Sequence, residues 1–313
     1  AHGEGLVGLM TSNNSSTIAI IDETSITGSL PNLHLVKTIK HTTFIYIPLR
    51  GSGLTTSPYE EFQINNNHYF CDTYDLTNLY PNENKSILFM SLSSIYLWNN
   101  GWRRPFEILG IPQVCIHMLQ GACITETFHD FNFSLTYIAR RSSLNPGTRF
   151  VARGLNDANA PGNALECELI FTRGNEFWTT RWIRGSIPIR WKTSMPTTVS
   201  AIKNYVDDDY FKGTTDYFQK LTRRFEIIPT ENEQSMFNSG PEPVPIPIRC
   251  FSLLKKHGKS TEKDVEEFYE KAISQLNEEG FQHVSIIHYD LAKKLKSDGS
   301  HNTLQEFLSI LIP

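Results

Sequence analysis

Alternating hydrophobic and polar positions characterise the first two thirds of the chain. Between residues 131 and 138, Phe131, Phe133, Leu135 and Tyr137 occupy every second position, with polar residues between them. Because successive side chains of a β-strand point to opposite faces, this two-residue period predicts a half-buried strand. Four further strands are predicted at 17–21, 43–47, 165–172 and 178–184. The residues at 156–163, rich in Asn, Pro and Gly, predict a turn before the strand at 165–172.

After about residue 195 the hydrophobic pattern takes the period of a helix. The spacing of Phe218, Leu221 and Phe225 predicts a helix over 214–225. A second helix is predicted over 261–277, with Thr261 and Asp264 as its N-terminal capping signal and Gly280 after its end. Its apolar stripe consists of Val265, Phe268, Ala272, Ile273 and Leu276.

A strand at 283–288 and a helix at 303–311 complete the predicted elements. A helix followed by a strand is typical of the start of an α/β layer. We therefore predict an α+β fold with a β-rich N-terminal subdomain at 1–195 and the beginning of an α/β subdomain at 196–313. The proline-rich segment 239–248 fits either a surface connection or a ligand for an SH3-type domain.

Composition excludes several classes of protein. The 313 residues are 39% hydrophobic and 20% charged, which is typical of a folded globular chain. The net charge of −4 gives no reason to expect nucleic-acid binding. No run of hydrophobic residues is long enough for a membrane-spanning helix, and no signal peptide is visible after Ala1. The five cysteines are widely spaced, with no metal-binding pattern, so we expect free thiols in a reducing cytoplasm.

Arginine is concentrated between residues 140 and 192. This stretch contains nine basic residues, eight of them arginine, against four acids, although the whole chain is acidic. The planar guanidinium group suits phosphate oxygens, so one interpretation is a phosphate-binding surface. The alternative is that these arginines are solvated or form ion pairs with the nearby glutamates. The residue types alone leave both interpretations open.

Three blocks in this stretch resemble Sac-domain phosphoinositide phosphatases. Residues 140–154 are similar to the family's RRS…GTR…RG stretch, 163–170 to its ANxVETEQI block, and 184–191 to its RGSIPxxW block, in family order and spacing. Weaker similarity is found at 70–77 (containing Asp75-Leu76-Thr77), 97–99, 120–121, 216–221 and 284–290.

The resemblance implies hydrolysis of phosphate from phosphatidylinositol phosphates by a Cys-x5-Arg loop, in which a cysteine thiolate attacks phosphorus. The sequence contains one such spacing, Cys167 to Arg173. We reject it as a catalytic loop because its residues predict a strand and Glu168 would repel phosphate. We therefore predict no catalytic residue in this chain, and no activity for the chain alone. We expect no cofactor and no metal ion.

The resemblance assigns roles to two groups of residues. The candidates for phosphoinositide binding are Arg140, Arg141, Arg149, Arg153 and Arg184. Residues matching the family motifs and expected to be structural are Gly147, Gly154, Glu166, Glu168, Gly185, Pro188 and Trp191. For Arg184 an ion pair with Glu166 or Glu168 is an equally good alternative.

Two functions follow from the resemblance. The first is a region of a phosphoinositide phosphatase whose nucleophile lies outside this chain. The second is a catalytically inactive module that binds phosphoinositides or proteins within a complex. In both cases we expect a eukaryotic, cytoplasmic protein peripheral to a phosphoinositide-containing membrane. An α/β layer that stops before its central strand exposes a sheet edge, so we also expect a partner protein or a further C-terminal segment to cover it.

Overall fold

The computed structural model describes residues 3–11, 15–48, 64–81, 94–148, 150–194, 203–225, 246–254 and 261–311. Arg149 and most of the proline-rich segment, 239–245, lie outside the described residues. Contacts divide the chain into two compact units. Unit 1 comprises 1–146 and 164–184, and unit 2 comprises 147–163 and 185–313. The predicted subdomain boundary at residue 195 stays a prediction.

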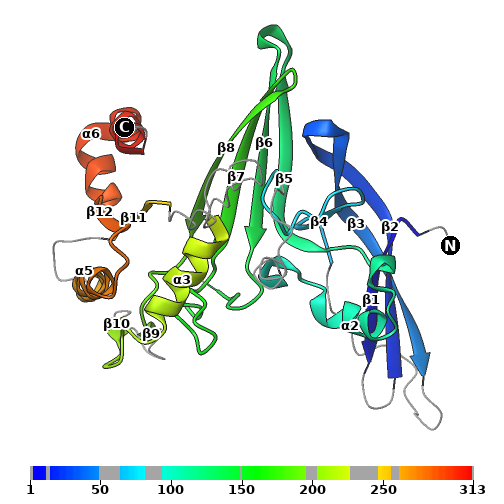
Figure 1. Ribbon diagram of the computed structural model, residues 1–313, viewed down its shortest axis with the longest axis horizontal. Coiled ribbons are helices and arrows are strands. Elements are labelled where there is room, and N and C mark those ends of the chain that lie inside the picture. Colours follow the sequence, from blue (N-terminus) through cyan, green and yellow to red (C-terminus); the bar gives the residue numbers. More distant parts are fainter. Residues whose placement is uncertain are drawn as a thin grey trace, which may run out of the picture. The chain divides into compact units, whose positions relative to one another are not determined.

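Unit 1 contains an eight-stranded sheet in which each strand pairs with the next one along the chain (Figure 1). All seven pairings are antiparallel. The strands are β1 (Gly5–Thr11), β2 (Ser15–Leu30), β3 (His34–Pro48), β4 (His68–Cys71), β5 (Leu119–Phe128), β6 (Phe133–Arg141), β7 (Leu165–Arg173) and β8 (Glu176–Arg184). Five of the six strands predicted from the sequence correspond to strands of this sheet, and the sixth, at 283–288, corresponds to β12 (Val284–His288) of unit 2. The predicted α+β class is confirmed.

Tight turns set the ends of the strands at the tip of the β5–β8 segment. A 3-10 turn at His129–Phe131 and a left-handed Asn132 (φ 50°) connect β5 to β6. The strand predicted from residue 131 therefore begins at Phe133. Gly174, also left-handed at φ 59°, lies in the turn between β7 and β8. Asparagine and glycine tolerate this conformation better than other residues do.

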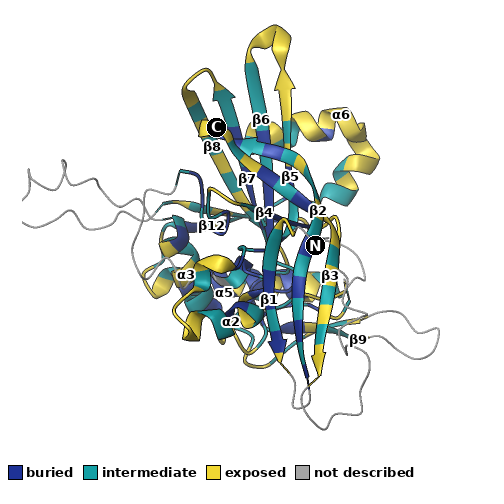
Figure 2. Cartoon of the chain, turned by 90° about the vertical axis from the view of Figure 1, so that its right-hand side faces the viewer, coloured by how far each residue is buried: buried dark blue, intermediate teal, exposed yellow. Residues whose placement is uncertain are grey.

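Burial alternates along the strands, as the two-residue period predicts (Figure 2). On β6 the buried face carries Thr136, Ile138 and Arg140, while Phe133 and Tyr137 on the opposite face are only partly buried. The more aromatic face of this strand is thus the less buried one. Polar groups can occupy the buried face only where hydrogen bonds satisfy them.

Two hydrophobic clusters lie against the sheet of unit 1. One surrounds Tyr69, Leu119 and Ile138, and the other surrounds Phe70, Ile21 and Met118. Helix α2 (Asn100–Ile108) contacts β1, and the preceding residue, Asn99, is fully buried. The Asn99 side chain donates to the carbonyls of Val7 (2.7 Å) and Ile116 (2.9 Å) and accepts from the Met118 amide (3.0 Å). The asparagine of the 97–99 block therefore joins three segments of unit 1.

In its described residues, unit 2 combines short strands with three helices. The elements are β9 (Trp191–Ser194), β10 (Lys203–Val206), α3 (Thr214–Phe225), β11 (Ile248–Ser252), α5 (Glu262–Glu278), β12 (Val284–His288) and α6 (Leu291–Leu311). Strands β9 and β10 are antiparallel, whereas β11 and β12 are parallel. The apolar stripe predicted for α5 packs into a cluster with Phe218, Ile189 and Trp191. Among the described helices, none is both long and apolar enough to span a membrane.

The ends of α5 test the sequence signals. Gly280 follows the helix with φ 101°, as predicted for its stop. Thr261 occupies the N-cap position, as predicted, but its side chain makes no capping hydrogen bond. Its hydroxyl instead accepts from the Asn204 amide at 2.9 Å, which ties α5 to β10.

Candidate functional site

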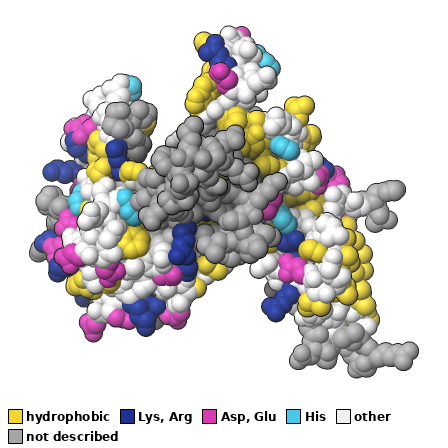
Figure 3. All heavy atoms as spheres, in the orientation of Figure 1, with side chains coloured by type: hydrophobic (Ala, Val, Ile, Leu, Met, Phe, Trp, Pro, Cys, Tyr) yellow, Lys and Arg dark blue, Asp and Glu magenta, His cyan; other side chains and the backbone are white. Residues whose placement is uncertain are grey.

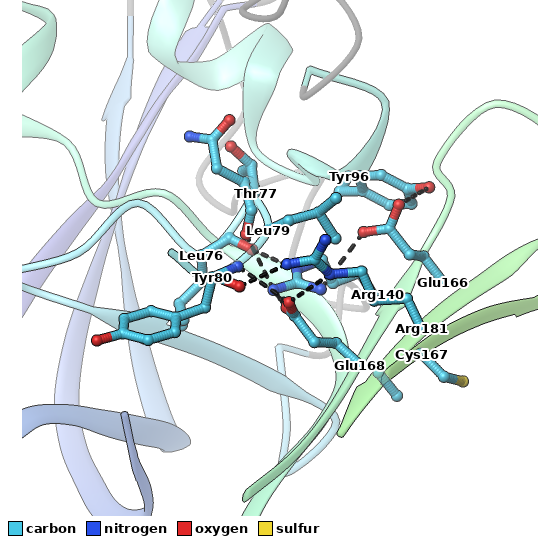
Figure 4. Close-up of polar contacts among 12 residues, drawn as sticks. Leu76, Thr77, Leu79, Tyr80, Tyr96, Arg140, Glu166, Cys167, Glu168 and Arg181 are labelled. Atoms are coloured by element: carbon cyan, nitrogen blue, oxygen red, sulfur yellow. Dashed lines mark hydrogen bonds and ion pairs between the residues drawn. The ribbon is translucent and has the colours of Figure 1, made fainter. Parts of the chain in front are cut away.

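The strongest concentration of buried charge in unit 1 centres on Arg140 of β6. Its guanidinium is fully buried and makes four hydrogen bonds (Figure 4). In two of them a main-chain carbonyl accepts: Nε donates to Leu76 O (2.5 Å) and Nη2 donates to Asn78 O (2.9 Å). The other two bind carboxylates, Glu168 Oε2 at 2.7 Å and Glu166 Oε1 at 3.3 Å.

The two glutamates have further partners on either side. Glu168 Oε1 accepts from the Tyr80 amide and from Arg181 Nε, each at 3.0 Å. Arg181 also donates to the Tyr80 carbonyl at 2.5 Å. On the other carboxylate, Glu166 Oε2 accepts from the Tyr96 hydroxyl at 3.2 Å. We call Arg140, Glu166, Glu168 and Arg181 the buried charge network. Its two positive and two negative charges cancel, which is the condition for burying ions at acceptable cost.

Strand pairing explains why these side chains meet. Arg140 lies opposite Glu166 in the β6–β7 register, and Glu168 lies opposite Arg181 in the β7–β8 register. Residues two apart on β7 project from the same face, so Glu166 and Glu168 both point toward the interior. The network therefore follows directly from the alternation of the three strands.

A turn formed by Asp75 presents the two carbonyls to Arg140. Asp75 Oδ1 accepts from the Thr77 amide (3.1 Å) and hydroxyl (2.7 Å), and Oδ2 accepts from the Asn78 side chain (3.0 Å). His117 contacts the same carboxylate at 2.8 Å. An aspartate that binds the amide two residues later holds the chain in a turn. The turn directs the carbonyls of Leu76 and Asn78 toward the guanidinium.

Electrostatics in this region fix the charge states. Burial alone lowers the pKa of Arg140, but the carboxylates of Glu168 and Glu166 outweigh it, so the pKa is raised above its ordinary value. Burial also acts to raise the pKa of Asp75, but the hydrogen bonds from His117 and Thr77 hold it below its ordinary value. Arg140 is therefore charged, and Asp75 is ionised, throughout the neutral pH range.

The structure corrects the prediction that Arg140 binds phosphoinositide. Its side chain has no exposure to solvent and its donors are directed at protein acceptors. The pairing considered for Arg184 is made instead by Arg181, three residues earlier and on the opposite face of β8. Arg184 is exposed. Arg141 is partly buried, donates to Gln120 Oε1 at 3.1 Å and lies 5.9 Å from the Trp98 ring.

The remaining motif residues lie in unit 2. The Arg153 guanidinium lies over the Trp191 ring at 5.2 Å, and the Gly154 amide donates to Ser186 Oγ at 2.8 Å. Gly154 adopts φ 60°, and an added Cβ would be 2.5 Å from Trp191 O. The 140–154 and 184–191 blocks therefore pack against each other through main chain at Gly154, where a side chain has no room.

Other residues of these blocks have structural surroundings. The Gly147 amide donates to Asn163 Oδ1 at 3.2 Å, and the carbonyl of the buried Pro188 accepts from the Thr214 hydroxyl at 2.9 Å. Gly185 is exposed. The lipid-binding assignments of Arg141, Arg153 and Arg184 stay predictions, and Arg149 lies outside the described residues.

Cys167 has none of the properties of a phosphatase nucleophile. It lies in β7, and every residue from Cys167 to Arg173 belongs to that strand. The thiol is fully buried, and this burial raises its pKa, although the Tyr137 hydroxyl 3.3 Å away acts in the opposite direction. A strand cannot direct consecutive amides at one anion. The Cys167–Arg173 spacing is thus not a phosphate-binding loop.

A second cluster of ionisable groups lies in unit 2. Ser252 and His288 are opposite each other at the carboxyl ends of the parallel strands β11 and β12. Both bind the buried carboxylate of Glu266 from α5, and His288 Nε2 lies 2.8 Å from Glu270. In the ranges that the structure describes, no group of three or more His, Cys, Asp or Glu side chains is arranged to hold a metal ion. The contacts around His288 connect α5 to this short sheet.

Sequence reasoning missed Arg181 and the carbonyls of Leu76 and Asn78. The signal for Arg181 was present, because it lies two residues before Ile183 and therefore on the same face of the strand predicted at 178–184. Main-chain carbonyls carry no signal in the residue types. The 70–77 block did contain the Asp75 turn, but nothing in the sequence places that turn beside β6.

Comparisons with known proteins match this chain to one family. The model of the SacI homology domain matches residues 4–296. Phosphoinositide phosphatase SAC4 of Arabidopsis thaliana is 34% identical over 104 residues, covering 31% of this chain and 12% of that protein. Phosphoinositide phosphatase SAC5 of the same plant is 29% identical over 185 residues (55% and 21%). Phosphatidylinositol-3-phosphatase SAC1, also from Arabidopsis, is 24% identical over 233 residues (68% and 23%). The matches thus span less than a quarter of the length of these relatives.

Proposed function

The chain belongs to the SacI homology domain family, and from this premise we propose that it is the scaffold region of a phosphoinositide phosphatase. The substrate class is taken from the printed names of its relatives, which are phosphatases of phosphoinositides. In this proposal the nucleophilic cysteine lies outside the 313 residues. The chain supplies the folded framework and part of the membrane contact.

One observation carries the proposal. Blocks of the sequence that resemble the family, at 70–77, 140–154 and 163–170, meet in the buried charge network and its supporting turn. Residues of these three family-like blocks therefore build part of the interior of unit 1. The one Cys-x5-Arg spacing lies within a strand and its thiol is buried. These observations support a chain that contributes to catalysis through its folded framework and does not supply the nucleophile.

Phosphate release by the isolated chain tests the proposal. The chain is incubated with soluble short-chain phosphoinositides, and inorganic phosphate is measured with malachite green. We expect no release above that of heat-denatured protein, and the same result for Cys167→Ser. Release that Cys167→Ser abolishes would show that the nucleophile is Cys167 and would overturn the proposal.

We also propose that Arg149 and Arg153 of the 140–154 block contact the anionic lipid headgroup, with Arg184 as a further candidate. A basic residue near an anionic membrane contributes about 1 kcal/mol to binding. Arg149→Ala and Arg153→Ala should therefore each weaken cosedimentation with phosphoinositide liposomes about fivefold at low salt. Arg104→Ala, which removes an exposed arginine of α2, is the matched control. Parent-like binding by both variants would contradict the assignment.

A second function uses the same scaffold without catalysis. In this alternative the protein is an inactive module, cytoplasmic and peripheral to membranes, that binds phosphoinositides or a partner protein. The short parallel sheet of β11 and β12 would then be extended by the partner. The parent gene distinguishes the two functions, since the first requires a Cys-x5-Arg loop beyond residue 313 and the second predicts that its cysteine is replaced.

The division into subdomains at 1–195 and 196–313 is part of the same proposal. Limited proteolysis should cleave first near residue 195 and yield two stable fragments. Early cleavage within either predicted subdomain, with no stable product of these sizes, would contradict this boundary.

A further inference from the structure

The face of β5–β8 opposite the buried charge network is mainly apolar, with charged side chains concentrated toward its ends, and we call it the outer face. The strand registers place Ile124, Tyr137, Leu169 and Thr180 side by side across its middle. On either side of this row, the outer face consists of Ala122, Glu126, Phe128, Phe133, Leu135, Ala139, Cys167, Phe171, Trp178 and Trp182, with Gln120, Arg141, Leu165 and Arg184 at one end and Arg173 and Glu176 at the other.

Large aromatic side chains on this face are open to solvent. Trp178 is 53% exposed and Trp182 is 42% exposed. The rings of Phe133, Phe171 and Trp178 form a continuous row, with centroids 4.9 and 5.3 Å apart. Hydrophobic side chains gather at the free end of these strands, with charged side chains at its tip (Figure 3). Soluble proteins rarely expose a contiguous apolar surface of this extent unless it binds something.

Strand β8 shows what this surface fits. Its outer-face residues run Glu176, Trp178, Thr180, Trp182, Arg184, with opposite charges at the two ends and a tryptophan on each side of the central threonine. A two-fold axis across the strands at Thr180 would place Glu176 opposite Arg184 of a second copy, and Trp178 opposite Trp182. The outer face of β8 is therefore complementary to itself, which is the requirement for an isologous interface.

We propose that the outer face of β5–β8 binds the same face of a second copy of this chain, in a two-fold symmetric sandwich with antiparallel strands. Two sheets commonly pack face to face through apolar side chains in this way. Tryptophan, tyrosine, phenylalanine and arginine, which dominate this face, are also the residues enriched in protein interfaces. The proposal is independent of catalysis, and Arg184 is the residue that it shares with the candidates for lipid binding.

The area agrees with a reversible dimer. Four strands about 4.8 Å apart and nine residues about 3.4 Å apart give a face of roughly 550 Å². The two copies together would bury about 1,100 Å², close to the lower limit for a specific interface. We therefore expect association that depends on protein concentration.

An anionic membrane fits this face less well. Glu126 and Glu176 lie on the outer face and Asp130 lies in the turn at its tip, whereas, among the described residues, Arg173 is the one arginine at this end of the face, so the tip that would enter the lipid carries more acidic than basic groups. These acids oppose an anionic bilayer, whereas in the symmetric dimer Glu176 meets an arginine.

Charge reversal tests the predicted pairing. Analytical ultracentrifugation of the 313-residue chain, without lipid, should show a monomer–dimer equilibrium. Glu176→Arg and Arg184→Glu should each weaken dimerisation by about tenfold, because each change creates two like-charge contacts across the axis. The double variant E176R/R184E should restore association, since both pairs are re-formed with the signs exchanged. Both residues are exposed, so the fold should persist, as checked by circular dichroism.

Arg104→Glu, on α2 and outside the outer face, is the matched control and should dimerise like the parent. Trp178→Ser should abolish the dimer without unfolding the chain. A chain that is monomeric at all concentrations, or a double variant no stronger than the single ones, would overturn the proposal. A monomer that binds anionic vesicles and loses this binding on Trp178→Ser would overturn it in favour of a membrane surface.

Discussion

Nη2 of Arg140 lies 2.7 Å from Oε2 of Glu168, and both side chains are completely inaccessible to solvent. An ion pair of this kind cannot exchange its partner for water. The guanidinium instead completes its contacts with Glu166 and two main-chain carbonyls. The arginine that best matched a lipid-binding motif thus holds a loop and two strands together.

Arg140→Ala should lower the free energy of unfolding by about 3–5 kcal/mol, because it leaves two carboxylates buried with less compensation. Arg140→Lys should recover only part of this loss, since an ammonium group cannot reproduce the four contacts of the planar guanidinium. Urea denaturation monitored by tryptophan fluorescence gives the values. Arg104→Ala, at an exposed position, should change the free energy of unfolding by less than about 0.5 kcal/mol. Equal losses in Arg140→Ala and Arg104→Ala would contradict a stabilising role for the buried charge network.

Asp75→Asn should change the dependence of stability on pH. The folded pKa of Asp75 lies below its ordinary value, so its ionised form stabilises the folded state fully above that value. This contribution is lost as pH falls through the lower, folded pKa. The difference in unfolding free energy between parent and variant should therefore be constant near neutrality and shrink below about pH 4. Urea titrations across this range measure it, and a difference that grows in acid would contradict the assignment.

Gly154→Ala and Gly174→Ala form a matched pair. Both glycines are left-handed, with φ 60° and 59°, but an added Cβ would collide with Trp191 O only at Gly154 and meets open space at Gly174. Gly174→Ala should cost about 1 kcal/mol for backbone strain alone. Gly154→Ala should cost about 2–4 kcal/mol, because the main chain of the neighbouring block must also move. Equal costs in denaturant titrations would show that the close packing is unimportant.

Cys167 should be unreactive in the folded protein. Its thiol is fully buried and burial raises its pKa, so little thiolate is present or accessible at neutral pH. Iodoacetamide labelling followed by mass spectrometry should modify the partly exposed Cys71 under native conditions and Cys167 only after unfolding in urea. Rapid native labelling of Cys167 would contradict the structure and reopen the question of a nucleophile in this chain.

Local patterns predicted the elements well where a single period dominates. The helix expected over 214–225 coincides with α3, and the stripe from Val265 to Leu276 packs into the core of unit 2. Strands β2 and β3 proved much longer than the segments at 17–21 and 43–47. Their outer parts are rich in Thr, Ser and Lys, so a hydrophobic pattern does not report them.

The site was harder to predict because its residues act across the sequence. Arg140 has the composition of a phosphate-binding residue, and only the pairing with Glu166 and the Asp75 turn reveals a structural role. For Thr261, the cap signal was correct in type, but a contact with Asn204 replaced the local one. In both cases a long-range hydrogen bond outweighed the local preference, and such bonds depend on the fold as a whole.

The cancellation of charge within the buried charge network limits which substitutions evolution can accept at its four positions, Arg140, Arg181, Glu166 and Glu168. Replacement of any one member strands an opposite charge in the interior, so a lineage that drifts at one position must soon change at another. Aligned relatives should accordingly show these four sites covarying, kept together in some branches and lost together in others. The four residues would then mark common ancestry in relatives known only from their sequences.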